Sequence, residues 1–185
     1  GLTGRTPKYG LHMDANRKAT KRYQVNMQPQ DLMEWGLLGA TIGRMAGSYW
    51  EVPVIQGIEI TPTSDQLKHF GAAMASFGSI PLYHIEGITP ECQKLADVAG
   101  EELPVTTVTE LEINNLKKPF DTKGEKVDVV VFAAPQLSII EMAELAELCA
   151  GKHRANTTDV IAHATRWAID RGKDTSIVCC LYATS

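Results

Sequence analysis

The chain has 185 residues, of which 44% are hydrophobic and 22% are charged, and its formal net charge at pH 7 is -4. This composition can form the core of one domain or slightly more, and it disfavours nucleic acids and anionic membranes as partners. No apolar run is long enough to span a bilayer, and no signal-peptide pattern is present. Because residue 1 is Gly, we expect a processed or excised chain.

The common metal and catalytic motifs are absent from this sequence. Its four cysteines, Cys92, Cys149, Cys179 and Cys180, include no CxxC pair of the kind that forms a self-contained zinc site. There is also no GxGxxG after a strand, P-loop, HExxH or GxSxG motif, which disfavours dinucleotide, nucleotide, zincin and α/β-hydrolase functions. We expect reduced, mostly buried thiols in a cytoplasmic protein.

Residues 4–20, GRTPKYGLHMDANRKAT, are polar and rich in turn-forming residues, without a sustained helical or strand period. We expect a loop here and assign residues 1–30 to a substrate-binding loop region. A charge cluster of this kind is more often a solvated surface, but it could also hold a carboxylate or phosphate. Its polar groups are Arg5, Lys8, His12, Asp14, Asn16, Arg17 and Lys18.

The capping pattern Asp31-Leu32-Met33-Glu34 predicts a helix that runs to about Gly47. Five apolar residues at helical spacing form its buried stripe: Leu32, Trp35, Leu38, Ile42 and Met45. Gly36, Gly39 and Gly43 lie near one another on this helix. Because each glycine costs about 1 kcal/mol of helix propensity, we expect close packing on a neighbouring backbone.

Strands and helices alternate from residue 52 onward. We expect, in order, strands at 52–55 and 58–60, a helix capped by Thr63 and Gln66, a strand at 80–85, a helix from Pro90 to about Ala99, a helix at about 109–116 and a surface loop at 117–126.

The last third of the chain continues this alternation. Residues 127–133 are almost continuously apolar, as expected of a strand covered on both faces. Ser138 and Glu141 form a capping box at a helix start. Residues 159–165 predict a strand that leads into a short helix ending at Arg171-Gly172, and residues 175–181 predict a last strand. The pattern predicts an α/β fold with a layered, mainly parallel sheet and helices on both faces. We expect one domain over residues 1–185, with βα units over 31–185.

Polar side chains lie at the exits of three of the expected strands: His84 and Glu86 at the first, Gln136 and Ser138 at the second, and His163 and Thr165 at the third. Ligands of parallel α/β sheets bind beyond the carboxyl ends of the strands, so neighbouring strands would bring these groups to one mouth. There His84, Glu86 and His163 could transfer protons to and from a small anionic substrate. Alternatively, Ser138 and Thr165 only cap their own helices.

The stretch His84-Ile85-Glu86-Gly87-Ile88-Thr89-Pro90-Glu91 joins an expected strand to an expected helix. Strand alternation places His84 and Glu86 on one face. Thr89 is typical of an N-cap, with Pro90 at the first helical position and Glu91 in the first turn, so that the helix start would form an anion site. The alternative is a well-capped turn with a solvated His and Glu.

These residues resemble the large subunit or domain of the aconitase X family. The similar blocks run in order along nearly the whole chain: Thr6-Pro7, Tyr9-Gly10-Leu11-His12, Asp14, Asn16-Arg17, Ala19-Thr20, Gly71-Ala72-Ala73, His84 to Glu91, Pro135, and Ser138 to Glu141. The resemblance covers the middle and later part of the family's large subunit, without the preceding part and the small swivelling domain.

The resemblance implies hydro-lyase chemistry, in which water is removed from a small hydroxy acid with iron or an iron–sulfur centre as Lewis acid. Members include cis-3-hydroxy-L-proline dehydratases and archaeal phosphomevalonate dehydratases, and a small swivelling subunit or domain is the implied partner. We expect cis-3-hydroxy-L-proline as substrate, with phosphomevalonate as the alternative, and an isolated chain without activity.

The same resemblance assigns roles to individual residues. It implies that His12, Asn16 and Arg17 bind substrate and that His84 and Glu86 form a catalytic wall. The predicted substrate-binding set is completed by Thr89, Gln136, Ser138 and His163.

One departure from the family concerns the metal. Where members have Gly-Cys-Pro-His, with the cysteine as a cluster ligand, this chain has Ala133-Ala134-Pro135-Gln136, and alanine cannot ligate iron. Cys179 or Cys180 could correspond to a later cysteine of the family. A metal-free interaction or regulatory domain of the same fold is therefore the alternative to an enzyme.

Overall fold

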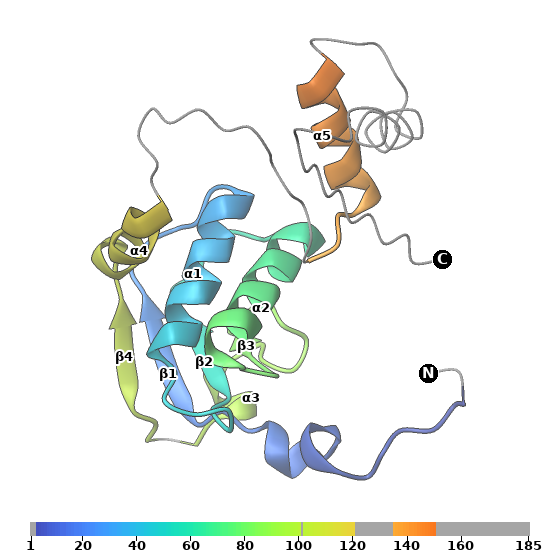
Figure 1. The fold of residues 1–185 in the computed structure, drawn as a ribbon. Helices are drawn as coiled ribbons and strands as arrows, with labels where there is room; N and C mark the ends of the chain where they lie inside the picture. The colour runs from blue at the N-terminus through green and yellow to red at the C-terminus, as the bar shows by residue number, and fades with distance from the viewer. Residues whose placement is uncertain (1–2, 101, 121–134, 151–185) are drawn as a thin grey trace. The chain divides into compact units, whose positions relative to one another are not determined.

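The computed structural model describes residues 3–100, 102–120 and 135–150 (Figure 1). The chain divides into two compact units, Gly1–Asp121 and Thr122–Ser185, and each is described by itself. The expected strands at 127–133, 159–165 and 175–181 lie outside the described residues, and the predicted single domain stays a prediction. No helix within the described ranges is both long and apolar enough to cross a bilayer.

A four-stranded parallel sheet forms the centre of the first unit (Figure 1). Its strands, in the order β3-β2-β1-β4, are β1 (Lys21–Val25), β2 (Pro53–Gln56), β3 (His84–Ile85) and β4 (Val105–Val108). Arg22 is in register with Val54 on one side and Val105 on the other, and Val54 is in register with His84. The predicted α/β fold with a parallel sheet is confirmed.

The strands were harder to predict than the helices. Sequence analysis missed β1, which begins with two cationic residues inside the expected loop region, and β4, which has only four residues. No strand forms at 58–60, and of the strand expected at 80–85 only His84 and Ile85 pair with a neighbour. Short strands depend on their neighbours in the sheet more than on their own residues, which explains these errors.

Helices cover both faces of the sheet, as predicted. On one face lie α1 (Leu32–Met45), α2 (Ser64–Gly78) and α4 (Glu110–Lys117) (Figure 1). They and the sheet enclose the main core: Tyr23, Val25, Trp35, Leu38, Ile42, Ile55, Phe70, Met74, Ile80, Ile85, Val108 and Ile113. On the other face, Val54 packs with Cys92 and with Val98 of the short helix α3 (Leu95–Val98).

The helix starts use the predicted capping residues. The Asp31 carboxylate accepts a hydrogen bond from the Glu34 amide at 2.8 Å, and Thr63 forms a reciprocal capping box with Gln66. In the second unit, α5 (Ile139–Ala150) begins with the predicted box, in which the Ser138 amide donates to Glu141 at 2.7 Å and the Glu141 amide to Ser138 at 3.1 Å. These pairs satisfy amides that a helix leaves unbonded at its start.

The helix expected from Pro90 to about Ala99 forms only over Leu95–Val98, because the chain first makes a closed turn after β3. The Thr89 hydroxyl accepts from the Ile85 amide at 3.0 Å and donates to the Ile85 carbonyl at 3.1 Å, so it does not cap a helix. Gly87 has φ +74° in this turn, and its amide donates to the Cys92 carbonyl at 2.8 Å. Because glycine adopts this left-handed conformation readily, the turn competes successfully with a helix start.

Two of the three glycines on α1 allow a close approach to α2. A Cβ atom on Gly39 would lie 2.2 Å from the Phe70 carbonyl oxygen, and one on Gly43 would lie 2.7 Å from that of Met74. A Cβ atom on Gly36 would meet nothing within 4 Å. The predicted backbone packing is thus confirmed for Gly39 and Gly43 and wrong for Gly36.

We predict opposite effects of alanine at two of these positions. Gly39→Ala forces the new methyl group into the backbone of α2 and should lower the free energy of unfolding by about 1–3 kcal/mol. Gly36→Ala adds helix propensity without a clash and should raise it by up to about 1 kcal/mol. Urea unfolding of both variants measures the difference, and a Gly39→Ala protein as stable as the wild type would contradict this helix packing.

Candidate functional site

A cavity of about 720 Å³ lies at the amino edge of the sheet, where the strands begin. It is lined by Ala19 and Thr20 just before β1, by Val52 just before β2 and by Pro81, which precedes β3. We call it the amino-edge cavity. The polar loop at the start of the chain therefore lies at the amino edge of the sheet. The ligand-binding groups were expected at the opposite edge, beyond the carboxyl ends of the strands.

Two short helical turns bring part of the predicted site to this cavity. They are η1 (Gly10–His12) and η2 (Asp14–Arg17), and the Asn16 side-chain amide donates to the Gly10 carbonyl at 2.8 Å to join them. His12 and Asn16 both line the cavity, whereas Arg17 does not. Thus two of the three opening-loop residues expected to bind substrate line the same cavity.

An exposed aromatic surface forms a second part of the lining. Tyr9, Tyr49 and Trp50 are all exposed and border the cavity, and the rings of Tyr49 and Trp50 pack edge to face with centroids 5.1 Å apart. Sequence analysis did not identify Tyr49 and Trp50. The feature that could have revealed them is an aromatic pair in the polar loop directly before a strand.

The largely buried carboxylate of Glu51 holds the loop that carries Tyr49 and Trp50. The Tyr23 hydroxyl donates to Glu51 at 2.5 Å, and the Gly47 amide donates to the other carboxylate oxygen of Glu51 at 3.1 Å. Burial, together with the hydrogen bond to Glu51, raises the pKa of Tyr23, so the phenol stays protonated and remains a donor. Glu51 thereby ties the end of the loop to β1 and joins it to Gly47 at the start of the loop.

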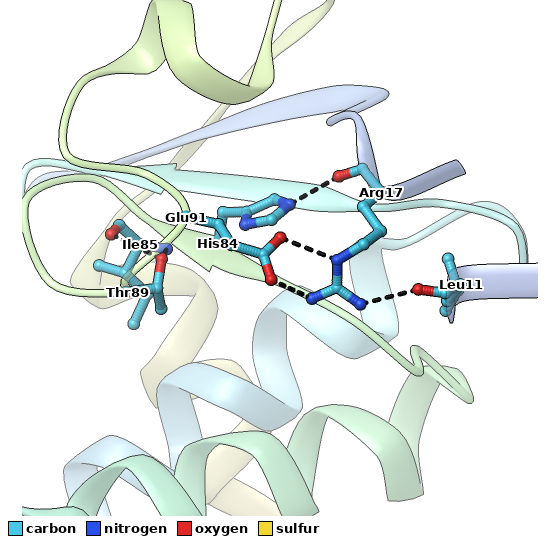
Figure 2. A network of polar contacts seen from close by, with 6 residues as sticks. All are labelled: Leu11, Arg17, His84, Ile85, Thr89 and Glu91. Carbon is cyan, nitrogen blue, oxygen red and sulfur yellow. Dashed lines mark hydrogen bonds and ion pairs between the residues drawn. The ribbon is translucent and has the colours of Figure 1, made fainter. Parts of the chain in front are cut away.

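A network of four residues connects the opening turns to β3 (Figure 2). The His84 ring is only 1% exposed, and its Nε2 lies 2.7 Å from the Arg17 carbonyl oxygen. Since a carbonyl can only accept, Nε2 carries the proton. The Arg17 guanidinium donates from Nε to Glu91 at 2.8 Å, from Nη2 to the second oxygen of Glu91, and from Nη1 to the Leu11 carbonyl at 2.8 Å. We call this network the turn clasp.

The predicted catalytic pair does not line the amino-edge cavity. The Glu86 carboxylate accepts from the Leu95 amide at 2.7 Å and from the Gln56 side chain at 2.6 Å, so it joins β2 to the start of α3. His84 borders a smaller hollow of about 270 Å³ beside the turn clasp. Contact of His84 and Glu86 with a substrate stays a prediction, and it requires each to release its present partners.

The remaining predicted residues are not placed at this cavity by the structure. Thr89 closes the turn after β3 and borders the same smaller hollow as His84. Gln136 and Ser138 belong to the second unit, and His163 and Thr165 lie outside the described residues. Their roles in ligand binding stay predictions.

The described residues do not fit the iron–sulfur centre implied by the family resemblance. Among them, no three His, Cys, Asp or Glu side chains are grouped so that they could hold a metal ion. Cys92 is buried, and burial, with Glu86 and Asp97 nearby, raises the pKa of its thiol to about 11. A thiol that resists ionisation is a poor metal ligand.

The fold and the cavity define a class, a parallel α/β domain with a ligand-sized hollow where its opening loop meets the strands. Residues 19–120 match the sequence profile of the aconitase X second domain. The chain belongs to the aconitase X family.

Several characterised proteins are similar to this chain. It is 35% identical to cis-3-hydroxy-L-proline dehydratase of Hypocrea jecorina, with 89% of this chain and 29% of the relative covered. It is 34% identical to the phosphomevalonate dehydratase large subunit of Thermococcus kodakarensis, with 80% and 36% covered. The crystal structure of Thermococcus kodakaraensis aconitase X in its holo form superposes with a TM-score of 0.71 at 29% identity. That comparison covers 97% of this chain and 48% of the relative, so the chain spans at most about half of these proteins.

We predict that the Arg17–Glu91 ion pair stabilises the fold in a pH-dependent way. The hydrogen bond from Arg17, with the guanidinium charge, lowers the pKa of Glu91 below its usual value of 4.5. The contribution is therefore complete above that value and is lost as the pH falls through the lowered pKa. Because the side chains are 28% and 47% exposed, it should be about 1 kcal/mol or less.

Urea unfolding of wild type and Glu91→Gln as a function of pH measures this contribution. The difference in unfolding free energy should be constant between about pH 6 and pH 8 and should shrink below about pH 4.5. A difference that grew on acidification would show that Arg17 does not stabilise the ionised form of Glu91.

Proposed function

We propose that the complete protein containing this chain is a hydro-lyase that removes water from a small hydroxy acid, with cis-3-hydroxy-L-proline as substrate. The observation that carries the proposal is the amino-edge cavity, whose wall contains Tyr9 to His12 and Asn16. These residues lie within the first block of the aconitase X resemblance. The relationship to two kinds of dehydratase supports the reaction class.

The chemistry of the cavity supports a cyclic amino acid. The exposed rings of Tyr49 and Trp50 offer apolar contact to a small ring and cation–π attraction to its ammonium group. His12 and Asn16 offer polar atoms for a carboxylate and a hydroxyl group. A single carboxylate needs few partners, which suits this mixed lining.

Phosphomevalonate is the second candidate substrate, because the Thermococcus kodakarensis relative is a phosphomevalonate dehydratase large subunit. A phosphate group would call for additional cationic donors. The ammonium group of Lys18, at the cavity wall, already donates to the Asp97 carbonyl at 2.8 Å. Arg17 faces Glu91 instead of the cavity, so the described wall suits a carboxylate better than a phosphate.

The proposed reaction requires a small partner subunit or domain. The relatives named large subunits support this assignment, and the chain spans only 36% of the one from Thermococcus kodakarensis. In the elimination, a base takes a proton from a substrate carbon while the neighbouring C–O bond breaks, and the leaving hydroxyl accepts a proton from an acid to depart as water. We place His12 in contact with the substrate carboxylate or leaving hydroxyl.

The decisive experiment measures water elimination by the complete protein with its small subunit. The complex is purified without oxygen and supplied with iron, because the family resemblance implies iron or an iron–sulfur centre. It is offered cis-3-hydroxy-L-proline and 5-phosphomevalonate separately. Turnover of the first supports the proposal and turnover of the second selects the alternative. A folded complex inactive on both would instead favour a metal-free interaction or regulatory domain.

We predict that His12→Gln raises KM about tenfold in the complete enzyme, because it removes a polar contact to a charged substrate. His69→Gln is the matched control, since His69 lies on α2 and does not line the cavity. Its KM should equal that of the wild type. Steady-state kinetics of the two variants tests this, and equal KM values for both would remove His12 from the binding site.

A further inference from the structure

We propose that Arg17 and Glu91 are positioning residues for the amino-edge cavity: they hold the opening turns so that His12 and Asn16 face the ligand. Only the kinetic part of its test rests on the proposed function. Nothing in the family resemblance singles out Glu91 for such a role, and Arg17 was expected to bind substrate directly.

The donors of Arg17 face Glu91 and the Leu11 carbonyl instead of the cavity. Two of its nitrogens face the Glu91 carboxylate and the third donates to the Leu11 carbonyl (Figure 2). Leu11 lines the cavity and Arg17 does not. The guanidinium therefore holds the cavity wall through the Leu11 carbonyl, without lining the cavity itself.

The backbone of Arg17 is held as firmly as its side chain. His84, the first residue of β3, donates to the Arg17 carbonyl. The second residue of β3, Ile85, is fully buried in the main core. Glu91 is placed by the turn that Thr89 closes onto Ile85. The turn clasp thus fixes residues 10–17 relative to the sheet.

The exposure of the ion pair indicates a local role. A pair with side chains 28% and 47% exposed contributes little to global stability. The opening turns contain few other restraints: the Met13 amide donates to Gly10, the Asn16 amide to Met13, and the Asn16 side chain to Gly10. These bonds all lie within the turns, so the clasp is what connects this part of the wall to β3 and the turn that follows it.

The competing role for Arg17 predicts the opposite sign. If Arg17 bound the substrate carboxylate, Glu91 would be a competitor for the same guanidinium, and removing its charge would lower KM. If Arg17 acts through the turn, Glu91→Gln loosens the wall and raises KM. The direction of the change therefore separates the two roles.

The test uses Glu91→Gln, Arg17→Gln and the double variant in the complete enzyme with cis-3-hydroxy-L-proline. We expect Glu91→Gln to raise KM about fivefold with kcat changed less than about twofold, and the double variant to match Arg17→Gln, as coupled residues do. Lys68→Gln is the control, because its ion pair with Asp65, at 3.1 Å, lies on α2. An unchanged or lowered KM for Glu91→Gln, or additive effects in the double variant, overturns the proposal.

Hydrogen exchange provides a readout that does not need activity. In the same variants, the amides of residues 10–16 should exchange faster after Glu91→Gln and at the wild-type rate after Lys68→Gln. Unchanged exchange in Glu91→Gln overturns the clasp even if the enzyme is active. If the wild type turns over neither substrate, the proposed function fails while the exchange data still decide the positioning role.

Discussion

The backbone contact between α1 and α2 sets the spacing of the first unit. A Cβ atom on Gly78 would lie 2.2 Å from the Gly43 carbonyl oxygen, so the two helices meet without side chains between them. At this distance Trp35 and Phe70, from the two helices, pack edge to face in one core above the sheet. The loop that carries Trp50 follows α1, and β3 follows α2. The contact between the two helices therefore helps to position both the aromatic side of the cavity and the side that the turn clasp connects to β3.

The position of the cavity follows from how the chain enters the sheet. Parallel α/β domains usually bind ligands beyond the carboxyl ends of their strands. Here the opening loop reaches β1 from its amino end, where the Ala19 amide donates to the Val98 carbonyl and the Thr20 amide to the Val52 carbonyl. These two bonds fix the loop between α3 and β2. The ligand-sized hollow therefore forms where the strands begin.

The sequence was most informative where structure is local. The caps at Asp31, Thr63 and Ser138 lie within three residues of their partners, and all of them could be predicted. Thr89 fits a capping pattern equally well, but it closes the turn that contains Gly87 instead of capping a helix. The local pattern does not distinguish these two structures. Three of the polar residues named in the opening loop, His12, Asn16 and Lys18, line the cavity.

The rest of the site depends on contacts between distant parts of the chain. Arg17 and Glu91 are 74 residues apart, and the separation between Tyr23 and Glu51 is 28 residues. The sequence carries no pattern that links such pairs, because each residue alone is an ordinary charged or aromatic side chain. His84 stands out in the sequence, but only the fold shows that it is buried and bonded to a backbone carbonyl.

The two sides of the cavity are held by interactions of different strength. Glu51, whose side chain is 10% exposed, bonds to Tyr23 inside the protein, where the low dielectric strengthens the hydrogen bond. Arg17 and Glu91 pair near solvent, where water and salt weaken their attraction. We therefore expect the loop that carries Tyr49 and Trp50 to be restrained more strongly than the opening turns.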